Sequence, residues 1–494
     1  MKGAIIKKIK FLTIIFVLLG SFLTAEQPQF EKYFVDTTLR IDYNIIGNSE
    51  TETIILDKLS KTGIWSGNPD RLLDKFNNGE YYYQVYDALT NEIIYSRGFD
   101  NYFREYQTTK PAAEGQKKVF QETALIPLPK NPVIFVVARR DDNNILKPIF
   151  EKQIDPADYH IIDQQIPDNY LYKVHVSGDP HKKVDLLFIG DGYTDKEKRA
   201  FKKDLDRYVE YLFDTEPFGK NSEKFNIYGI MPESMERGVD QPRKKDYKKT
   251  AIEATFNSLE SPRYLLTENI WELHDIASQT PYDAICIMVN SERYGGGGIY
   301  NYYCTFTADN DRSDFTFLHE LGHSFGGLAD EYYSSSVAYS NFYPKDIEPT
   351  EPNITALIDP DRLKWKDQLS EGIEIPTDWN KAEYDSMSIL LSELRSERNH
   401  ELSRLKQNQA SQEKIDSVRN DYKTRINRLD KKLKDFILNH PLKDKIGVFE
   451  GAGYESEGIY RPTVNSIMKE FIGDRAFNKV CEKALSEIIE HYTE

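Results

Sequence analysis

The sequence predicts a multidomain α+β protein, in which an N-terminal all-β sandwich precedes a mixed α/β domain with an inserted α-helical hairpin. Three observations predict this arrangement. Turn residues recur about every 8–12 residues up to residue 166, as in β sandwiches. From residue 167, strand patterns alternate with helical patterns. No Gly or Pro occurs between Pro376 and Pro441, so this stretch can form long helices.

Residues 1–25 are typical of a signal peptide. Four lysines precede an apolar run over residues 11–19, and the small residue Ala25 precedes a polar segment. An uncleaved anchor is the alternative, but the run is shorter than the roughly 20 residues that span a bilayer. We therefore expect an exported protein, in the periplasm, on the cell surface or in the medium, with no membrane span in the mature chain.

The composition excludes several classes of protein. A chain that is 39% hydrophobic and 13% aromatic can build a packed core, which excludes a disordered protein. Its formal net charge of −16 disfavours nucleic acid as a partner, because nucleic-acid binders present a basic surface. Three cysteines are too few for a disulfide framework. The composition leaves the oligomeric state open.

The two predicted domains differ in pattern. Residues 26–166 contain short strand candidates between turns, at residues 81–86, 93–95 and 132–138, without a catalytic constellation. Residues 167–494 contain strand candidates at 184–189, 225–230 and 283–290 and a helix near 270–277. Thr194 and Glu197 have the spacing of a capping box, which predicts a helix that runs to about residue 213.

Residues 383–440 are expected to form a helical hairpin inserted into the second domain. Apolar residues of the second half recur at steps of three and four, as in the seam between paired helices. These residues are Ile415, Val418, Tyr422, Ile426, Leu429, Leu433 and Phe436. Leu391, Leu394, Leu402 and Leu405 mark the partner helix, with the turn at residues 407–412.

The motif with clear chemical content is His319-Glu320-Leu321-Gly322-His323. Histidines four residues apart project from one face of a helix, and two imidazole nitrogens suit Zn²⁺. Glu320 can reach a zinc-bound water without ligating the metal. Zinc lowers the pKa of that water, and the glutamate can take its proton as general base. We expect one catalytic Zn²⁺, with His319 and His323 as ligands and Glu320 as the catalytic base.

A third ligand is expected beyond this helix. Gly326 and Gly327 can end the helix, because glycine tolerates the left-handed conformation at a helix C-terminus. The chain can then turn back and bring Asp330 or Glu331 to the metal. A single carboxylate oxygen would complete three protein ligands and leave the fourth position for water, as in catalytic zinc sites.

Two further segments would complete a peptidase site. Met468 lies in a predicted turn, and a Met-turn beneath the ligands is the hallmark of metzincins. Residues 295–298 are four glycines, interpreted as a flexible loop that enters an edge strand at residues 299–306. An edge strand beside a metal cleft can pair with an extended peptide through main-chain hydrogen bonds.

At these motifs the sequence resembles the bacterial IgA-peptidase family of zinc metallopeptidases, which is metzincin-like. The resemblance covers most of the chain beyond residue 25, on residues 120–127, 185–194, 449–454 and 460–462 and on the metal helix with its Asp330-Glu331-Tyr332 ending. It implies proteolysis of a protein or peptide substrate. By this resemblance His319, His323 and Asp330 are the metal ligands, Glu320 is the general base and Met468 is the Met-turn residue.

The chain departs from the metzincin pattern at the third ligand and in the hairpin. Metzincins place that ligand ten positions after the first histidine, where this chain has Ala329; Asp330 follows one position later.

The sequence predicts a secreted zinc endopeptidase whose substrate lies along the edge strand. Two alternatives are a non-catalytic surface binding protein with a structural zinc, and a zinc exopeptidase with Glu331 as a ligand.

Overall fold

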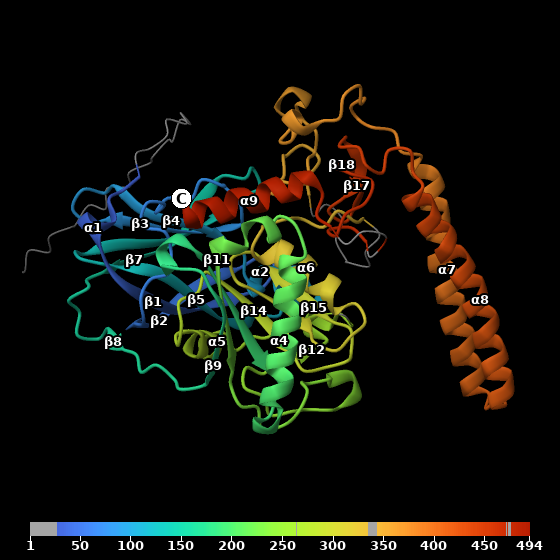
Figure 1. The fold of residues 1–494 in the computed structure, drawn as a ribbon, viewed down its shortest axis with the longest axis horizontal. Helices are drawn as coiled ribbons and strands as arrows, with labels where there is room; N and C mark the ends of the chain where they lie inside the picture. Colours follow the sequence, from blue (N-terminus) through green and yellow to red (C-terminus); the bar gives the residue numbers. More distant parts are fainter. Residues whose placement is uncertain (1–26, 263, 334–342, 471, 473–475) are drawn as a thin grey trace, which may run out of the picture.

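The computed structural model describes residues 27–262, 264–333, 343–470, 472 and 476–494. The predicted signal peptide lies outside the described residues. Figure 1 shows two β-rich parts that pack together, with a pair of long helices extending away from them. Among the described residues, no helix has both the length and the apolar character needed to cross a bilayer.

The N-terminal part is rich in β structure, as expected. It contains two four-stranded sheets, with strand orders β5-β1-β2-β8 and β4-β3-β6-β7. The strands are β1 (Phe34–Gly47), β2 (Glu52–Lys61), β3 (Tyr81–Asp87), β4 (Ile93–Phe99), β5 (Lys118–Pro129), β6 (Val133–Arg140), β7 (Leu146–Ile154) and β8 (Ile162–Asp163). Three short helices accompany them: α1 (Phe30–Tyr33), α2 (Tyr102–Gln107) and α3 (Lys110–Ala113). The hydroxyls of Tyr43 on β1 and Tyr83 on β3 lie 3.2 Å apart in the core that the two sheets share.

The second part is built on a six-stranded mixed sheet in the order β15-β16-β14-β10-β11-β9. Its four central strands are parallel, and both end strands run antiparallel to their neighbours. The strands are β9 (Tyr170–Val176), β10 (Val184–Asp191), β11 (Phe225–Met231), β14 (Ala284–Val289), β15 (Gly296–Ile299) and β16 (Tyr303–Thr307). Two small ribbons add β12 (Thr255–Phe256) with β13 (Leu265–Leu266), and β17 (Phe449–Ala452) with β18 (Glu455–Arg461).

The two faces of this sheet belong to different cores, because successive side chains of a strand point to opposite faces. On β10, Leu186 and Phe188 pack with helices α4 (Lys198–Phe213), α6 (Ser313–Ser324) and α9 (Lys479–Thr493). Leu187 and Ile189 instead join helix α5 (Ile270–Ala277) and the N-terminal sheets in one continuous core. The N-terminal part is therefore joined to the second part by a shared apolar core.

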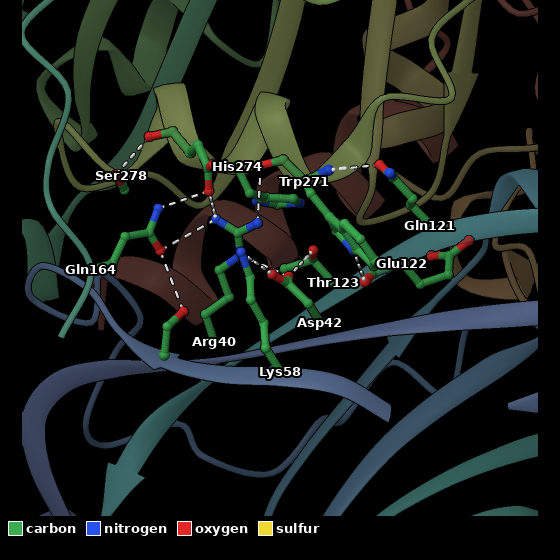
Figure 2. Close-up of polar contacts among 12 residues, drawn as sticks. Arg40, Asp42, Lys58, Gln121, Glu122, Thr123, Gln164, Trp271, His274 and Ser278 are labelled. Carbon is green, nitrogen blue, oxygen red and sulfur yellow. Dashed lines mark hydrogen bonds and ion pairs between the residues drawn. The ribbon is translucent and has the colours of Figure 1, made fainter. Parts of the chain in front are cut away.

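A buried polar network fixes the same boundary (Figure 2). Arg40 on β1 donates to Asp42 over 2.7 Å, to the carbonyl oxygen of Trp271 over 2.9 Å, and to Asp275. Trp271 and Asp275 both belong to α5, and Arg40 is only 1% exposed. Because a buried guanidinium needs partners for all of its donors, these contacts specify how α5 sits on the N-terminal sheet.

The predicted helices of the hairpin are present as α7 (Lys381–Gln407) and α8 (Gln412–Leu438). The turn lies between Gln407 and Gln412, where the sequence predicts it. The seam buries mainly the predicted apolar residues: Leu391, Leu394, Leu405, Ile415, Ile426, Leu429 and Leu433. The paired helices extend from the body of the molecule, and their base adjoins β17 and β18 (Figure 1).

One sequence expectation is wrong in detail. The predicted strand over residues 299–306 is two strands, β15 and β16, joined by a turn in which Asn301 has a φ of 51°. The glycine run is not a flexible loop, because Gly296, Gly297 and Gly298 form most of β15. The physical reason is close packing. A Cβ at Gly296 would lie 2.7 Å from Thr316, and one at Gly298 would lie 2.3 Å from the carbonyl oxygen of Glu320.

Candidate metal centre

Helix α6 carries the predicted motif and packs against β15 and β16, at one edge of the sheet. Phe317 and Leu321 are buried in the core beneath the helix. Gly322 lets Met468 pack directly against the helix, because a Cβ at this position would lie 2.6 Å from the sulfur of Met468. With one face of α6 fixed in this way, His319, Glu320 and His323 lie along the other face.

Each histidine is oriented by a backbone carbonyl group. The Nδ1 atom of His319 lies 2.9 Å from the carbonyl oxygen of Ile467, and that of His323 lies 2.6 Å from the carbonyl oxygen of Leu328. Nδ1 must carry the proton in these contacts, which leaves each Nε2 lone pair available to a cation. The two Nε2 atoms are 3.2 Å apart.

The bend after α6 brings a carboxylate to the two imidazoles. Gly327 has a φ of 55°, in the left-handed region, and the chain turns back there. The Oδ1 atom of Asp330 lies 3.1 Å from Nε2 of His319 and 3.3 Å from Nε2 of His323. Asp330 is 5% exposed, and Oδ1 has no hydrogen-bond partner among the described residues.

These three ligand atoms fit one small cation. Donors about 2.0–2.1 Å from a tetrahedral Zn²⁺ lie about 3.3–3.4 Å from one another. The observed separations of 3.1, 3.2 and 3.3 Å are close to this face of a tetrahedron. Glu320 also offers a carboxylate oxygen within 4.8 Å of both imidazoles. The site therefore has three convergent donors and a nearby carboxylate.

The charges in the site favour a bound cation. Burial alone would lower the pKa of His323, but the adjacent carboxylate of Asp330 raises it to about 9. Burial likewise opposes ionisation of Asp330, yet the charge of His323 lowers the pKa of Asp330 below its usual range. A negative charge is thus stabilised at Oδ1, where a positive group must face it.

The side chain of Glu331 does not face the imidazoles but is surrounded by hydrogen-bond donors. Its carboxylate is fully buried and accepts hydrogen bonds from four side chains. The donors are Ser466 at 2.6 Å, Asn478 at 2.8 Å, Asn353 at 3.1 Å and the thiol of Cys481 at 3.4 Å. Burial raises the pKa of Glu331, and these hydrogen bonds oppose the rise. Glu331 therefore joins the bend to the segment around Met468 and to the start of α9.

Comparison with known families agrees with this architecture. Residues 172–489 match the family model of IgA peptidase M64, and residues 29–151 match the model of the peptidase M64 N-terminus. The chain belongs to the M64 family. It is therefore a peptidase of a metallopeptidase family. No curated protein matches the sequence.

In this M64 peptidase, two cavities adjoin the site; His319, His323 and Asp330 all line the smaller one, whereas of these three residues His319 alone lines the larger one. One has a volume of about 170 Å³ and the other about 250 Å³. His319, Glu320, Tyr264 and Tyr332 line both cavities. The glycines of β15 form part of each wall, so the end strand of the sheet lies beside the cleft, as the sequence predicts. Tyr264 pairs with Gly296 in an isolated bridge and covers part of that edge.

The N-terminal part of the peptidase contributes to the smaller cavity. Asn78, Asp100 and Glu105 line it together with the metal-site residues. The side-chain amide of Asn78 donates to the carbonyl oxygen of Gly327 over 2.9 Å and so holds the bend after α6. The backbone N–H of Asp100 donates to the carbonyl oxygen of Tyr300 over 2.9 Å.

Sequence reasoning did not assign a role to Asn78 or Tyr454. Nothing in the sequence around Asn78 connects it to a bend almost 250 residues away. Tyr454 lies within the glycine-containing segment that carries part of the family resemblance, and its phenol donates to Oδ2 of Asp330. Met468 was predicted, and the structure places it against α6 with its carbonyl oxygen accepting from the N–H of Glu331 over 2.8 Å.

Proposed function

We propose that this M64 peptidase is a zinc-dependent endopeptidase. The observation that carries the proposal is the triangle formed by Nε2 of His319, Nε2 of His323 and Oδ1 of Asp330, with sides of 3.1–3.3 Å. These residues would hold the ion. Bound Zn²⁺ would supply a Lewis acid that lowers the pKa of water and polarises the scissile carbonyl group.

The chain's own groups provide the proton transfers. Glu320 takes a proton from the attacking water and delivers it to the leaving nitrogen, as a general base and then a general acid. The carbonyl oxygens of Ile467 and Leu328 hold the histidine tautomers. Met468 beneath the helix acts as the Met-turn residue of a metzincin-like site, and the hairpin is an insertion into that fold.

An endopeptidase is favoured over an exopeptidase because both cavities share His319 and Glu320. A peptide can then extend in both directions from the scissile bond. The carboxylate of Glu331 is held by four hydrogen-bond donors, which argues against an exopeptidase that uses Glu331 as a metal ligand. A structural zinc in a binding protein would need a fourth protein ligand, whereas Glu320, whose carboxylate lies within 4.8 Å of both imidazoles, lines both cavities.

The test is the variant Glu320→Gln, assayed with and without a chelator against a peptide library read by mass spectrometry. We expect the variant to bind Zn²⁺ with wild-type stoichiometry but to lose peptidase activity by at least about 100-fold, as expected for loss of a general base. The chelator should abolish cleavage by the wild type. Wild-type activity in Glu320→Gln, or products cut only at a terminus, would contradict the proposal.

We also propose export through a signal peptide at residues 1–25. The support is the sequence pattern alone. The N-terminal sequence of protein recovered outside the cytoplasm checks it, with the expected start just after Ala25.

A further inference from the structure

Tyr454 occupies a backbone conformation that tyrosine rarely adopts. The pairing of β17 with β18 ends at Ala452 and Glu455, which leaves Gly453 and Tyr454 as a two-residue turn. Their φ values are 57° and 65°. Such turns favour Gly, Asn and Asp, because a left-handed conformation is sterically unfavourable for most other residues. A strained residue of this kind is often retained because its side chain has a function.

The turn contacts the metal-site bend through its backbone and through its side chain. The N–H of Gly453 donates to the carbonyl oxygen of Asp330 over 2.9 Å, and the N–H of Tyr454 donates to that of Tyr332 over 3.0 Å. The phenol of Tyr454 donates to Oδ2 of Asp330. The other oxygen, Oδ1, is the one that faces the histidines.

We infer that Tyr454 is a positioning residue that fixes Asp330 as a one-oxygen ligand of the metal. The inference rests on the proposed zinc site and deepens it. With Oδ2 held by the phenol, only Oδ1 can approach the ion. Without the phenol, the carboxylate can rotate, so that Oδ1 is no longer held in the geometry that suits the ion and Oδ2 can enter the position that water needs. Partners of metal ligands act in this way, and their loss typically weakens metal binding by about 10–100-fold.

The test compares two Tyr→Phe variants of the full chain. Tyr454→Phe removes the hydroxyl and keeps the ring. The matched control is Tyr193→Phe, because the buried Tyr193 also donates to a carboxylate, that of Asp204 over 2.9 Å, but away from the metal site. Zinc affinity is measured by competition with a chromophoric chelator, and the stability of the metal-free protein by thermal unfolding. We expect Tyr454→Phe to bind Zn²⁺ about 10–100-fold more weakly and Tyr193→Phe to bind it within about twofold of wild type.

A second variant separates positioning from turn structure. Tyr454→Asn places a residue that suits the turn but cannot reach Asp330. We expect it to lose zinc affinity as Tyr454→Phe does, although its backbone is less strained. Wild-type zinc affinity in either Tyr454 variant would overturn the inference. Glu320→Gln tests the proposed mechanism independently, because it should change catalysis without changing zinc affinity.

Discussion

Two fully buried glutamates, Glu331 in the bend of the metal centre and Glu122 at the domain boundary, have opposite surroundings. Glu331 accepts four side-chain hydrogen bonds. Neither carboxylate oxygen of Glu122 has a hydrogen-bond partner of normal geometry among the described residues. Burial raises the pKa of Glu122 well above its usual value, and the nearby phenol of Tyr302 only partly opposes this. Burial of a carboxylate is thus costly in both regions, but the hydrogen-bond donors around Glu331 offset much of the cost and Glu122 lacks such donors.

The largest effect is expected from Glu331→Ala. It would leave buried donors of Ser466, Asn353 and Asn478 without their acceptor, and we expect a loss of about 3 kcal/mol or more of unfolding free energy. Urea denaturation of the metal-free protein measures the change. Glu331→Gln is the milder comparison, since it keeps one oxygen and the side-chain volume. A loss below about 1 kcal/mol in Glu331→Ala would show that the donors find other partners.

For Glu122→Gln we expect a gain in the free energy of unfolding instead of a loss. The pKa of Glu122 is higher in the folded than in the unfolded protein, so wild-type stability falls as pH rises from the unfolded pKa through the folded pKa. The glutamine amide of the variant does not ionise, so the stability of the variant does not fall with pH in this way. We expect Glu122→Gln to gain about 1–2 kcal/mol at pH 8 and little at pH 4, where Glu122 is mostly protonated in both states.

The control for this prediction is Glu50→Gln, because Glu50 is exposed. Urea denaturation at the two pH values should show no pH-dependent gain for the control. A wild type that is equally or more stable than Glu122→Gln at pH 8 would mean that Glu122 has an ionic partner in solution.

The smallest effect is expected from the distal hairpin, residues 395–428 of α7 and α8, which has no buried acid and does not line either cavity at the metal site. The base of the hairpin does contact the site, because Tyr384 donates to Glu470, a residue that lines the larger cavity. We expect a variant in which a short Gly-Ser linker replaces residues 395–428 to cleave a short peptide with kcat/KM within about twofold of wild type, since distant sites are usually independent. A larger change would show that the distal hairpin acts on the cleft.

Local pattern predicted much of this fold. The helix at Ile270–Ala277 and the turn between Gln407 and Gln412 follow from apolar spacing, because each depends on neighbours in the sequence. The motif on α6 can also be read from local spacing, since histidines four residues apart share a face of a helix. The sequence does not predict that the glycines of β15 form a strand. They allow α6 to pack closely against β15, and this tertiary contact leaves no signal in the local sequence.

The roles of the acids around the site depended on tertiary structure. Sequence spacing left Asp330 and Glu331 as alternatives, because both follow the same bend. The structure distinguishes them by their surroundings: Oδ1 of Asp330 faces two imidazoles, whereas Glu331 meets donors from three distant segments. The side chains of Asn78 and Tyr454 act through hydrogen bonds to residues far away in the sequence, and such contacts leave no periodic pattern in the sequence.

The hydrogen bond from Asn78 to Gly327 has a practical consequence for work with this peptidase. A truncated version that starts at residue 167 would lose the amide that holds the bend after α6, together with the N-terminal residues that line the smaller cavity. It would also expose the apolar side of the central sheet to water. The smallest active unit should therefore include both halves, and inhibitors should be screened against the intact polypeptide.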